Sequence, residues 1–439
     1  MARNRVRRPR KTVSRANPEG ESHGGSFPGG RVRRSGSGTT GGAPNPDADI
    51  EAFSRYTGIR SLLNPLWCYH GFRISVLALI CFGVIMVFSS SSVTMISEGS
   101  SPWKQALSQG IYCILGFIAG FIAMHIPVAL YRKFGLWFVG FSILLQLLTI
   151  TPLGIEVNGN TGWIGLPGGF TLQPAEVMKL ALCIWLPSAM EISRRFYRRD
   201  GIKAYLIPAL VFLACLGAVM LGKDLGTTMI LIMIGAAAFL VGGFPGRWLA
   251  SIFACLALAV AAFVVTSPNR LDRVMAAYKP CTEADAQSVC YQAIHAKYAM
   301  ASGGFLGVGI GNSREKWNYL PEAHNDFIFA IIGEETGFVG AAMVIVLFAV
   351  LGWCMISIAV QSTSRYVSMT LVCITVWIVG QSMINVMVVI GMLPVMGLPM
   401  PFISAGGSSL IMCIIAAGIA VDMMRTQPQI KADSSALSS

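Results

Sequence analysis

The sequence predicts an all-α polytopic membrane protein with about ten transmembrane helices. Hydrophobic residues make up 54% of the 439 residues and charged residues only 12%, whereas a soluble domain carries about 25% charged residues. Apolar runs long enough to span a bilayer, which takes about 20 residues as a helix, recur along most of the chain. The ten expected helices cover residues 72–88, 105–124, 129–150, 175–191, 204–221, 226–242, 248–266, 327–359, 367–390 and 408–424.

The positions of Lys and Arg predict the orientation, because basic residues concentrate in short cytoplasmic loops. If the N-terminal tail is inside, the basic residues of the internal turns also fall inside; they are Arg132, Lys133, Arg194, Arg195, Arg198, Arg199, Lys203, Arg247, Arg365 and Arg425. We therefore expect both termini in the cytoplasm. The segments expected outside are 89–104, 151–174, 222–225, 267–326 and 391–407.

Composition divides the chain into two tails and a membrane domain. Residues 1–70 are rich in Arg, Gly, Ser and Pro and too poor in apolar residues to bury a core, so we expect a disordered basic cytoplasmic tail. The membrane domain follows at 71–425, and 426–439 forms a short cytoplasmic tail. The basic clusters of the first tail favour anionic lipid headgroups or a cytoplasmic partner over nucleic acid.

Two of the eleven cysteines differ from the rest. Most lie singly in apolar helices, and none has zinc-binding spacing. Cys281 and Cys290 both fall in the large extracellular loop expected at 267–326, where an oxidising exterior permits a disulfide. Two independent thiols are the alternative.

The most informative stretch is 320–337, which combines a His with four carboxylates before and inside an apolar helix. Asp326 lies at the mouth of this helix, and Glu334 and Glu335 lie roughly 12–14 Å further along its axis. Each ionised group at membrane depth costs on the order of 2.5–3.5 kcal/mol. The stretch therefore predicts a polar cavity that opens on the outer face. Capping of the helix is the alternative role for Asp326.

Two further acidic positions have both a structural and a functional interpretation. Glu176 and Lys179 lie three apart on one helical face, just after Pro174. They form either an ion pair that neutralises itself or a cation that meets a phosphate at the cavity rim. Asp224 precedes an apolar helix, so it either caps that helix or faces the same cavity.

Two glycine-rich loops complete the set. Residues 303–313 contain GxG spacing, but no strand precedes them, so close backbone packing explains them better than nucleotide binding. Residues 393–409 form a proline-stiffened loop that ends in small polar residues, including Ser404 and Ser408. Its backbone amides at a helix start predict an anion cradle; helix capping and close packing explain the same residues.

Together these motifs resemble the SEDS proteins, the shape, elongation, division and sporulation glycosyltransferases of bacteria, and most closely the division members. The resemblance covers about residues 70–425 in order, with motifs at 173–179, 224–227, 303–313, 320–329, 333–337 and 398–409. Two positions depart from the pattern. Residues 158–163 lack the arginine pair usual there, and Ala405 stands where a Tyr is common.

The resemblance implies an enzyme that polymerises lipid II, the undecaprenyl-diphosphate-linked disaccharide-peptide, at the outer face of the bacterial cytoplasmic membrane, at the division septum. It implies that Asp326 is the general base for the acceptor sugar hydroxyl. Glu322 and His324 would shape or assist this base. A lipid II flippase and a non-catalytic divisome scaffold are the alternatives.

The departing diphosphate would need positive charge. Lys179, Lys316 and Arg314 are the candidate side chains, and a divalent cation such as Mg²⁺ or Mn²⁺ is another source. Glu334 and Glu335 are expected to hold helices together rather than to act chemically.

The resemblance also implies partners: a single-pass class B penicillin-binding transpeptidase and other divisome proteins. Small residues permit close approach between membrane helices. We therefore expect the transpeptidase helix to pack near Gly340 or Gly380.

Overall fold

A computed structural model describes residues 58–157, 160–166, 170–266, 271, 275, 278, 290–317 and 319–431. The predicted disordered tail lies outside these residues, apart from 58–70, and so does the C-terminal tail after residue 431.

The predicted fold class is confirmed, since each of the ten predicted segments falls on helical structure. The crossings are α2 (Pro65–Ser97), α3 (Lys104–Ala123), α4 (Val128–Leu148), α5 (Pro174–Asp200), α6 (Leu206–Leu221), α7 (Leu225–Val241), α8 (Gly246–Val265), α12 (Ile328–Gln361), the continuous run α13 (Arg365–Thr375), η3 (Val376–Gly380) and α14 (Gln381–Val389), and α15 (Gly407–Arg425). Short helices are η1 (Gly58–Leu63), η2 (Gly201–Tyr205) and α11 (Tyr291–Ser302).

Length and composition support membrane crossing. Among the described residues, seven helical stretches are long and apolar enough to span a bilayer, one of them the 48-residue stretch that contains α5 and α6. The helix α7 is apolar but shorter.

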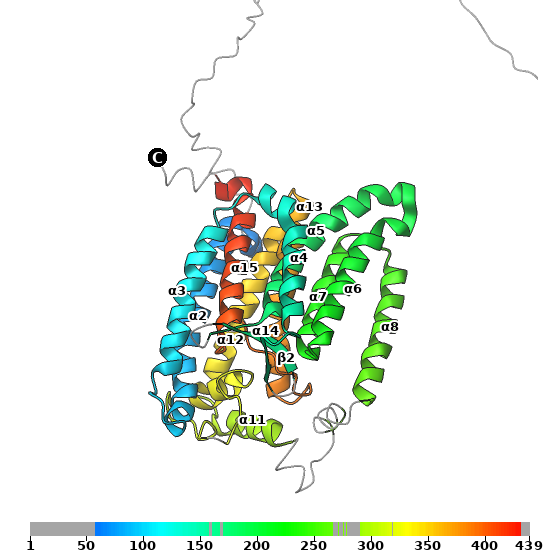
Figure 1. The fold of residues 1–439 in the computed structure, drawn as a ribbon. Helices are drawn as coiled ribbons and strands as arrows, with labels where there is room; N and C mark the ends of the chain where they lie inside the picture. Colours follow the sequence, from blue (N-terminus) through cyan, green and yellow to red (C-terminus); the bar gives the residue numbers. More distant parts are fainter. Residues whose placement is uncertain are drawn as a thin grey trace, which may run out of the picture. The chain divides into compact units, whose positions relative to one another are not determined.

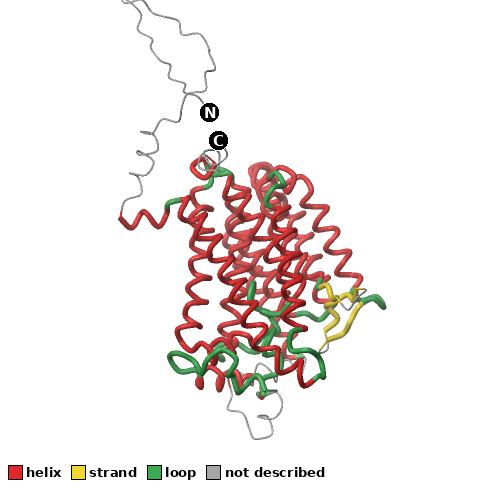
Figure 2. The backbone as a smooth tube through the Cα atoms, turned by 90° about the vertical axis from the view of Figure 1, so that its left-hand side faces the viewer, coloured by secondary structure: helices red, strands yellow, loops and turns green. Residues whose placement is uncertain are grey.

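The helices stand side by side in an upright bundle, with α11 at one end (Figure 1). At the opposite end the start of α2 meets the ends of α12 and α15: Gln361 Nε2 donates to the Leu63 carbonyl at 2.8 Å, and Arg425 Nε donates to the Tyr69 hydroxyl at 3.1 Å. Both ends of the membrane domain therefore lie at one end of the bundle, as an even number of crossings requires. We call these ends the α11 end and the arginine end; Figure 2 shows the same bundle from the side.

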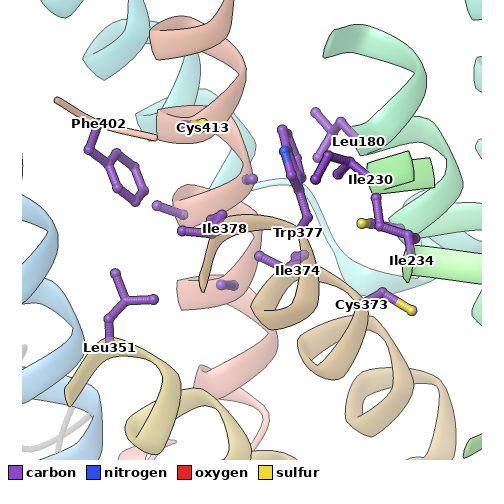
Figure 3. Packing of buried hydrophobic residues seen from close by; sticks show 14 of the residues in the cluster. Leu180, Ile230, Ile234, Leu351, Cys373, Ile374, Trp377, Ile378, Phe402 and Cys413 are labelled. Carbon is purple, nitrogen blue, oxygen red and sulfur yellow. The ribbon is translucent and has the colours of Figure 1, made fainter. Parts of the chain in front are cut away.

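The core is packed around η3, a π-helical turn. Its Trp377 is fully buried and lies beside Leu180 of α5 and Ile230 of α7, with Phe402 and Cys413 nearby (Figure 3). Packing is close elsewhere too: a Cβ at Gly418 of α15 would overlap the carbonyl oxygen of Gly120 in α3. Only glycine therefore fits at that contact.

The helix α12 is broken at Gly337, whose φ of 66° and ψ of −164° are not helical. Its 34 residues would extend about 51 Å, well beyond the roughly 30 Å hydrocarbon core of a bilayer. Residues 303–309 pack against the break, where Val308 and Gly309 donate backbone hydrogen bonds to the carbonyls of Glu334 and Glu335, each at 3.0 Å. Close backbone packing by this glycine-rich loop is thus confirmed.

The sequence-based prediction lacks both α11, which lies in the expected extracellular loop, and a small sheet. A small antiparallel sheet of β1 (Gly154–Val157), β2 (Asn160–Leu166) and β3 (Phe170–Leu172) forms in order between α4 and α5. Ile155 pairs with Trp163, and Ile164 pairs with Leu172. The sheet lies at the segment predicted as an outside loop.

Candidate functional site

The loop 391–406 turns back into the bundle, although its sequence predicts an outside segment. Leu398, Met400 and Phe402 are almost fully buried. A Cβ at Gly83, in the middle of α2, would lie only 2.7 Å from the Phe402 carbonyl oxygen. Non-helical backbone at membrane depth is tolerated where protein buries it, so we call 391–406 the re-entrant loop.

The re-entrant loop holds the segment that carries Asp326. The Ser404 hydroxyl donates to the Asn325 carbonyl at 2.7 Å, and the Ala405 N–H donates to the His324 carbonyl at 2.9 Å. Asp326 itself is half-buried, two residues before α12, whose N-cap position is Phe327. Its carboxylate therefore lies at the junction of α12 and the re-entrant loop.

Two buried side-chain amides of α14 bind the re-entrant loop, and one of them also binds the Asp326 segment. Asn385 Nδ2 donates to the Asp326 carbonyl at 2.7 Å and to the Leu398 carbonyl at 2.8 Å. Gln381 Nε2 donates to the Pro399 carbonyl at 2.7 Å. Sequence reasoning did not single out either amide; the available signal was two amides four residues apart in an otherwise apolar helix.

Lys179 contacts one of these amides, Gln381. Its ammonium lies 2.8 Å from Glu176 Oε1 and 2.9 Å from Gln381 Oε1, and 5.3 Å from the centre of the Trp377 ring. The side chains of Lys179 and Glu176 are 0% and 1% exposed. The ion-pair interpretation is therefore confirmed, and contact of either residue with substrate, which stays a prediction, would require this pair to open.

Asp224 connects α7 to α5. One carboxylate oxygen accepts from the Thr227 N–H at 2.9 Å, which confirms the helix N-cap. The other accepts from Gln173 Nε2 at 3.4 Å. The Gln173 N–H in turn donates to the Ser408 hydroxyl at 3.2 Å, so Asp224 and Ser408 both belong to the network around the site.

Ser404 is fully engaged within the loops. Besides its bond to Asn325, its hydroxyl accepts from the Met400 N–H at 2.7 Å. Substrate contact by Ser404 or Ser408 stays a prediction, because both hydroxyls already tie loops together.

A second charged cluster lies at the break in α12. The Lys316 ammonium pairs with Glu335 Oε1 at 2.9 Å, and the Ser89 hydroxyl donates to the same carboxylate at 2.7 Å. Glu334 accepts from the Arg314 N–H at 2.8 Å. The two glutamates thus hold α12, α2 and the 313–316 segment together, as expected.

The same cluster bears on the cation expected for the diphosphate. The Lys316 side chain is 3% exposed and pairs with Glu335, so contact with a ligand, which stays a prediction, would require this pair to open. The Arg314 residue is exposed. Of the cations proposed from the sequence, only Arg314 is exposed at the surface of this structure.

Glu322 and His324 lie in the segment that carries Asp326, and a role in shaping or assisting the base stays a prediction. Glu322 Oε2 accepts from Asn325 Nδ2 at 2.6 Å. Burial lowers the pKa of His324 below its usual range, and the carboxylates of Glu322 and Glu98 offset only part of that effect. The imidazole is therefore favoured in its neutral form.

Backbone strain concentrates around this site. Among the described residues, three that are not glycine have positive φ: Lys223 at 62°, Glu322 at 57° and Phe402 at 65°. They lie within four residues of Asp224, Asp326 and Ser404 respectively. Strained conformations of this kind cluster at functional sites, where surrounding structure holds them.

The predicted disulfide and the possible divalent cation are the two remaining predictions. Cys290 is disulfide-bonded, while Cys281 lies outside the described residues, so their pairing stays a prediction. Within the described part of the chain no three His, Cys, Asp or Glu residues group closely enough to hold a metal ion.

The two glycines expected to meet the transpeptidase differ in exposure. Gly340 is buried, whereas Gly380 is partly exposed, and a Cβ at Gly380 would lie 2.7 Å from the Met233 side chain of α7. The contact stays a prediction at both positions.

Comparisons with known proteins agree with this architecture. Residues 70–429 match the family described as cell cycle protein, which joins FtsW, RodA and SpoVE. The probable peptidoglycan glycosyltransferase FtsW of Mycobacterium tuberculosis is 36% identical over 370 residues, covering 83% of this chain and 69% of that protein. Stage V sporulation protein E of Bacillus subtilis is 36% identical over 358 residues, covering 80% and 95%.

Solved structures share the fold. A chain from a study of how a peptidoglycan synthase complex coordinates polymerization and crosslinking matches with a TM-score of 0.65 and 25% identity, covering 82% of this chain and 98% of that one. The rod shape determining protein RodA of Thermus thermophilus matches with a TM-score of 0.60 and 24% identity, covering 83% and 97%. The chain belongs to the FtsW/RodA/SpoVE family of polytopic membrane proteins.

Proposed function

We propose that this protein is a peptidoglycan glycosyltransferase that polymerises lipid II, with Asp326 as the general base. The observation that carries the proposal is the position of Asp326: a half-buried residue just before α12, in a segment whose backbone carbonyls accept hydrogen bonds from the re-entrant loop and from α14. Several relatives carry the name peptidoglycan glycosyltransferase.

The reaction would join two lipid-linked sugars. The 4-hydroxyl of the acceptor attacks the anomeric carbon of the donor, Asp326 accepts the hydroxyl proton, and the bond from the anomeric carbon to the diphosphate oxygen breaks. A positioned base contributes roughly 10²–10⁴-fold to such a step. The neutral His324 and the strained Glu322 lie two and four residues before Asp326 in the sequence and would shape the acceptor side.

The leaving diphosphate carries negative charge that a cation must stabilise. The exposed Arg314 is the candidate side chain for this contact, and a divalent ion is the other. The backbone N–H groups at the start of α15, beside Ser408, would add partial positive charge.

The lipid portion of the substrate requires an apolar surface. A groove of about 550 Å³ is lined by apolar and aromatic side chains of α3, α4, α5 and α15. Its lining fits an isoprenoid or acyl chain, which supports a lipid-linked substrate but does not select one.

We further propose the setting of this activity. Both termini would be cytoplasmic, because the arginine end of the bundle carries the basic turns, and Asp326 would face outward. The enzyme would work at the division septum with a class B penicillin-binding transpeptidase and other divisome proteins. A similar fold occurs in a peptidoglycan synthase complex, which supports such a partner.

The test is reconstitution of the purified full chain in vesicles with labelled lipid II, with and without a transpeptidase. Glycan polymer on addition of protein supports the proposal. Translocation of lipid II without polymer would replace it with a flippase, and neither activity, with intact binding to divisome proteins, would replace it with a scaffold.

A further inference from the structure

Two side-chain amides of α14 lie beside the proposed base: Asn385 reaches the Asp326 backbone, and Gln381 reaches the re-entrant loop. Gln381 and Asn385 lie four residues apart, so they project from one face of the helix. They are 0% and 2% exposed. Buried side-chain polar atoms usually have hydrogen-bond partners, and those of this pair do, except Asn385 Oδ1.

The partners of Asn385 fix the direction of its amide. Its Nδ2 donates at 2.7 Å to the Asp326 carbonyl and at 2.8 Å to the Leu398 carbonyl. Both neighbours are acceptors, so both N–H groups are used and the amide nitrogen must face them. One side chain thus joins the Asp326 segment to the re-entrant loop.

Charge fixes the direction of the Gln381 amide. Its Oε1 accepts from the Lys179 ammonium at 2.9 Å, so its nitrogen must face the Pro399 carbonyl at 2.7 Å. Lys179 is itself held by Glu176. The buried ion pair therefore acts through Gln381 on the re-entrant loop, rather than standing alone in the bundle.

The π-helical turn η3 explains how an apolar helix presents these amides. It occupies Val376–Gly380, immediately before Gln381. A π-bulge adds one residue to a helix and so rotates the residues after it by roughly 100° about the axis. Without that residue, both amides would point away from the loop carbonyls.

We propose that Asn385, supported by Gln381, is a positioning residue that sets where the Asp326 carboxylate lies relative to the acceptor hydroxyl. The inference rests on the proposed function, since it needs Asp326 to act as the base. Asn385 touches the Asp326 backbone and the re-entrant loop, and it acts on the reaction through them.

The test compares two buried residues of the same helix. Asn385→Leu removes both loop hydrogen bonds at similar size, whereas Ser382→Ala removes a bond of 2.8 Å to Ile378 within the helix. Initial polymerisation rates are measured against lipid II concentration for purified full-length protein. Asn385→Leu should lower the saturated rate by about 100-fold, the loss expected for a misplacement near 1 Å, with little change in half-saturating concentration. Ser382→Ala should keep the saturated rate and the half-saturating concentration of the parent.

Epistasis separates this inference from its premise. In an Asp326→Asn background, Asn385→Leu should cause no further loss of the residual rate. A saturated rate like the parent's, or a loss that appears mainly in half-saturating concentration, overturns the positioning role. If Asp326→Asn itself retains the parent's rate, the proposed base is wrong instead. Asn385→Ser, which adds no apolar bulk, provides the same readout if the leucine variant does not insert.

Discussion

The buried pair between Lys179 and Glu176 makes the stability of the bundle unusually sensitive to one side-chain change. Both side chains are essentially unexposed, and Glu176 Oε2, the oxygen that Lys179 does not bind, has no hydrogen-bond partner. Lys179→Met keeps the length of the side chain but leaves the Glu176 carboxylate without its counter-ion. Removing one partner of a buried pair costs about 3–5 kcal/mol.

The loss of stability in Lys179→Met comes from the Glu176 carboxylate that stays buried without a counter-ion. A variant that removes both charges therefore provides a matched comparison. In the double variant Glu176→Leu with Lys179→Met, both charges are absent and only Gln381 loses a partner. Replacing a complete buried pair with apolar residues is often close to neutral. The double variant should therefore recover most of the stability that Lys179→Met loses.

The assay is unfolding of purified protein from mild detergent by titration with sodium dodecyl sulfate, followed by intrinsic tryptophan fluorescence. Trp377, whose ring lies near the Lys179 ammonium, is one of the nine tryptophans that contribute to this signal. Equal stability of the parent and Lys179→Met would refute the reasoning, because it would mean that water or another cation already compensates Glu176. A double variant less stable than Lys179→Met would refute it too.

Three further outcomes are expected from the structure. Non-reducing peptide mapping should recover Cys281 and Cys290 in one linked peptide, and alkylation of both thiols without reductant would rule that bond out. Because burial lowers the pKa of His324, the unfolded chain binds a proton at this side chain more readily than the folded protein does. Stability should therefore fall as pH drops below about 6.5 towards the lowered pKa. His324→Gln should show a smaller fall in melting temperature between about pH 7 and pH 5, and a fall equal to that of the parent would contradict this. Ser89→Ala removes a donor to the Glu335 carboxylate and should cost about 1.5–3 kcal/mol in the same detergent titration, so an unchanged midpoint would argue against that contact.

The helices were predictable because each is a long apolar run, and length alone identifies a spanning segment. The small sheet was not, since its strands are short and interrupted by glycines such as Gly162 and Gly165. Local sequence carries little signal for such strands, whose pairing is set by the neighbouring helix ends, as in the bond from the Thr161 N–H to the Gly222 carbonyl.

The site was predictable in its charges but not in its geometry. Asp326, Glu322 and His324 stand out because charge beside an apolar helix is costly. The depth of the re-entrant loop in the bundle was not predictable, because prolines and glycines indicate irregular backbone but not where that backbone lies. Asn385 carries no charge, so only its contacts with two loops reveal its role.

The position of Lys316 shows the same limit. A cation in an outside segment predicts ligand contact, yet Glu335 lies 19 residues away in the sequence and meets it at 2.9 Å. Only the break at Gly337, which lets residues 303–316 fold back on α12, brings the two together. Sequence spacing alone does not contain that contact.

The most direct test of the account is polymerisation of labelled lipid II by Asp326→Asn. The substitution keeps the size of the side chain and removes the basic carboxylate. It leaves in place the hydrogen bonds from Asn385 to the Asp326 carbonyl and from Ser404 to the Asn325 carbonyl. We predict normal insertion and a loss of rate of at least about 100-fold, the lower bound of a general base's contribution. Turnover near that of the parent, from a variant that inserts normally, would contradict the assignment of Asp326.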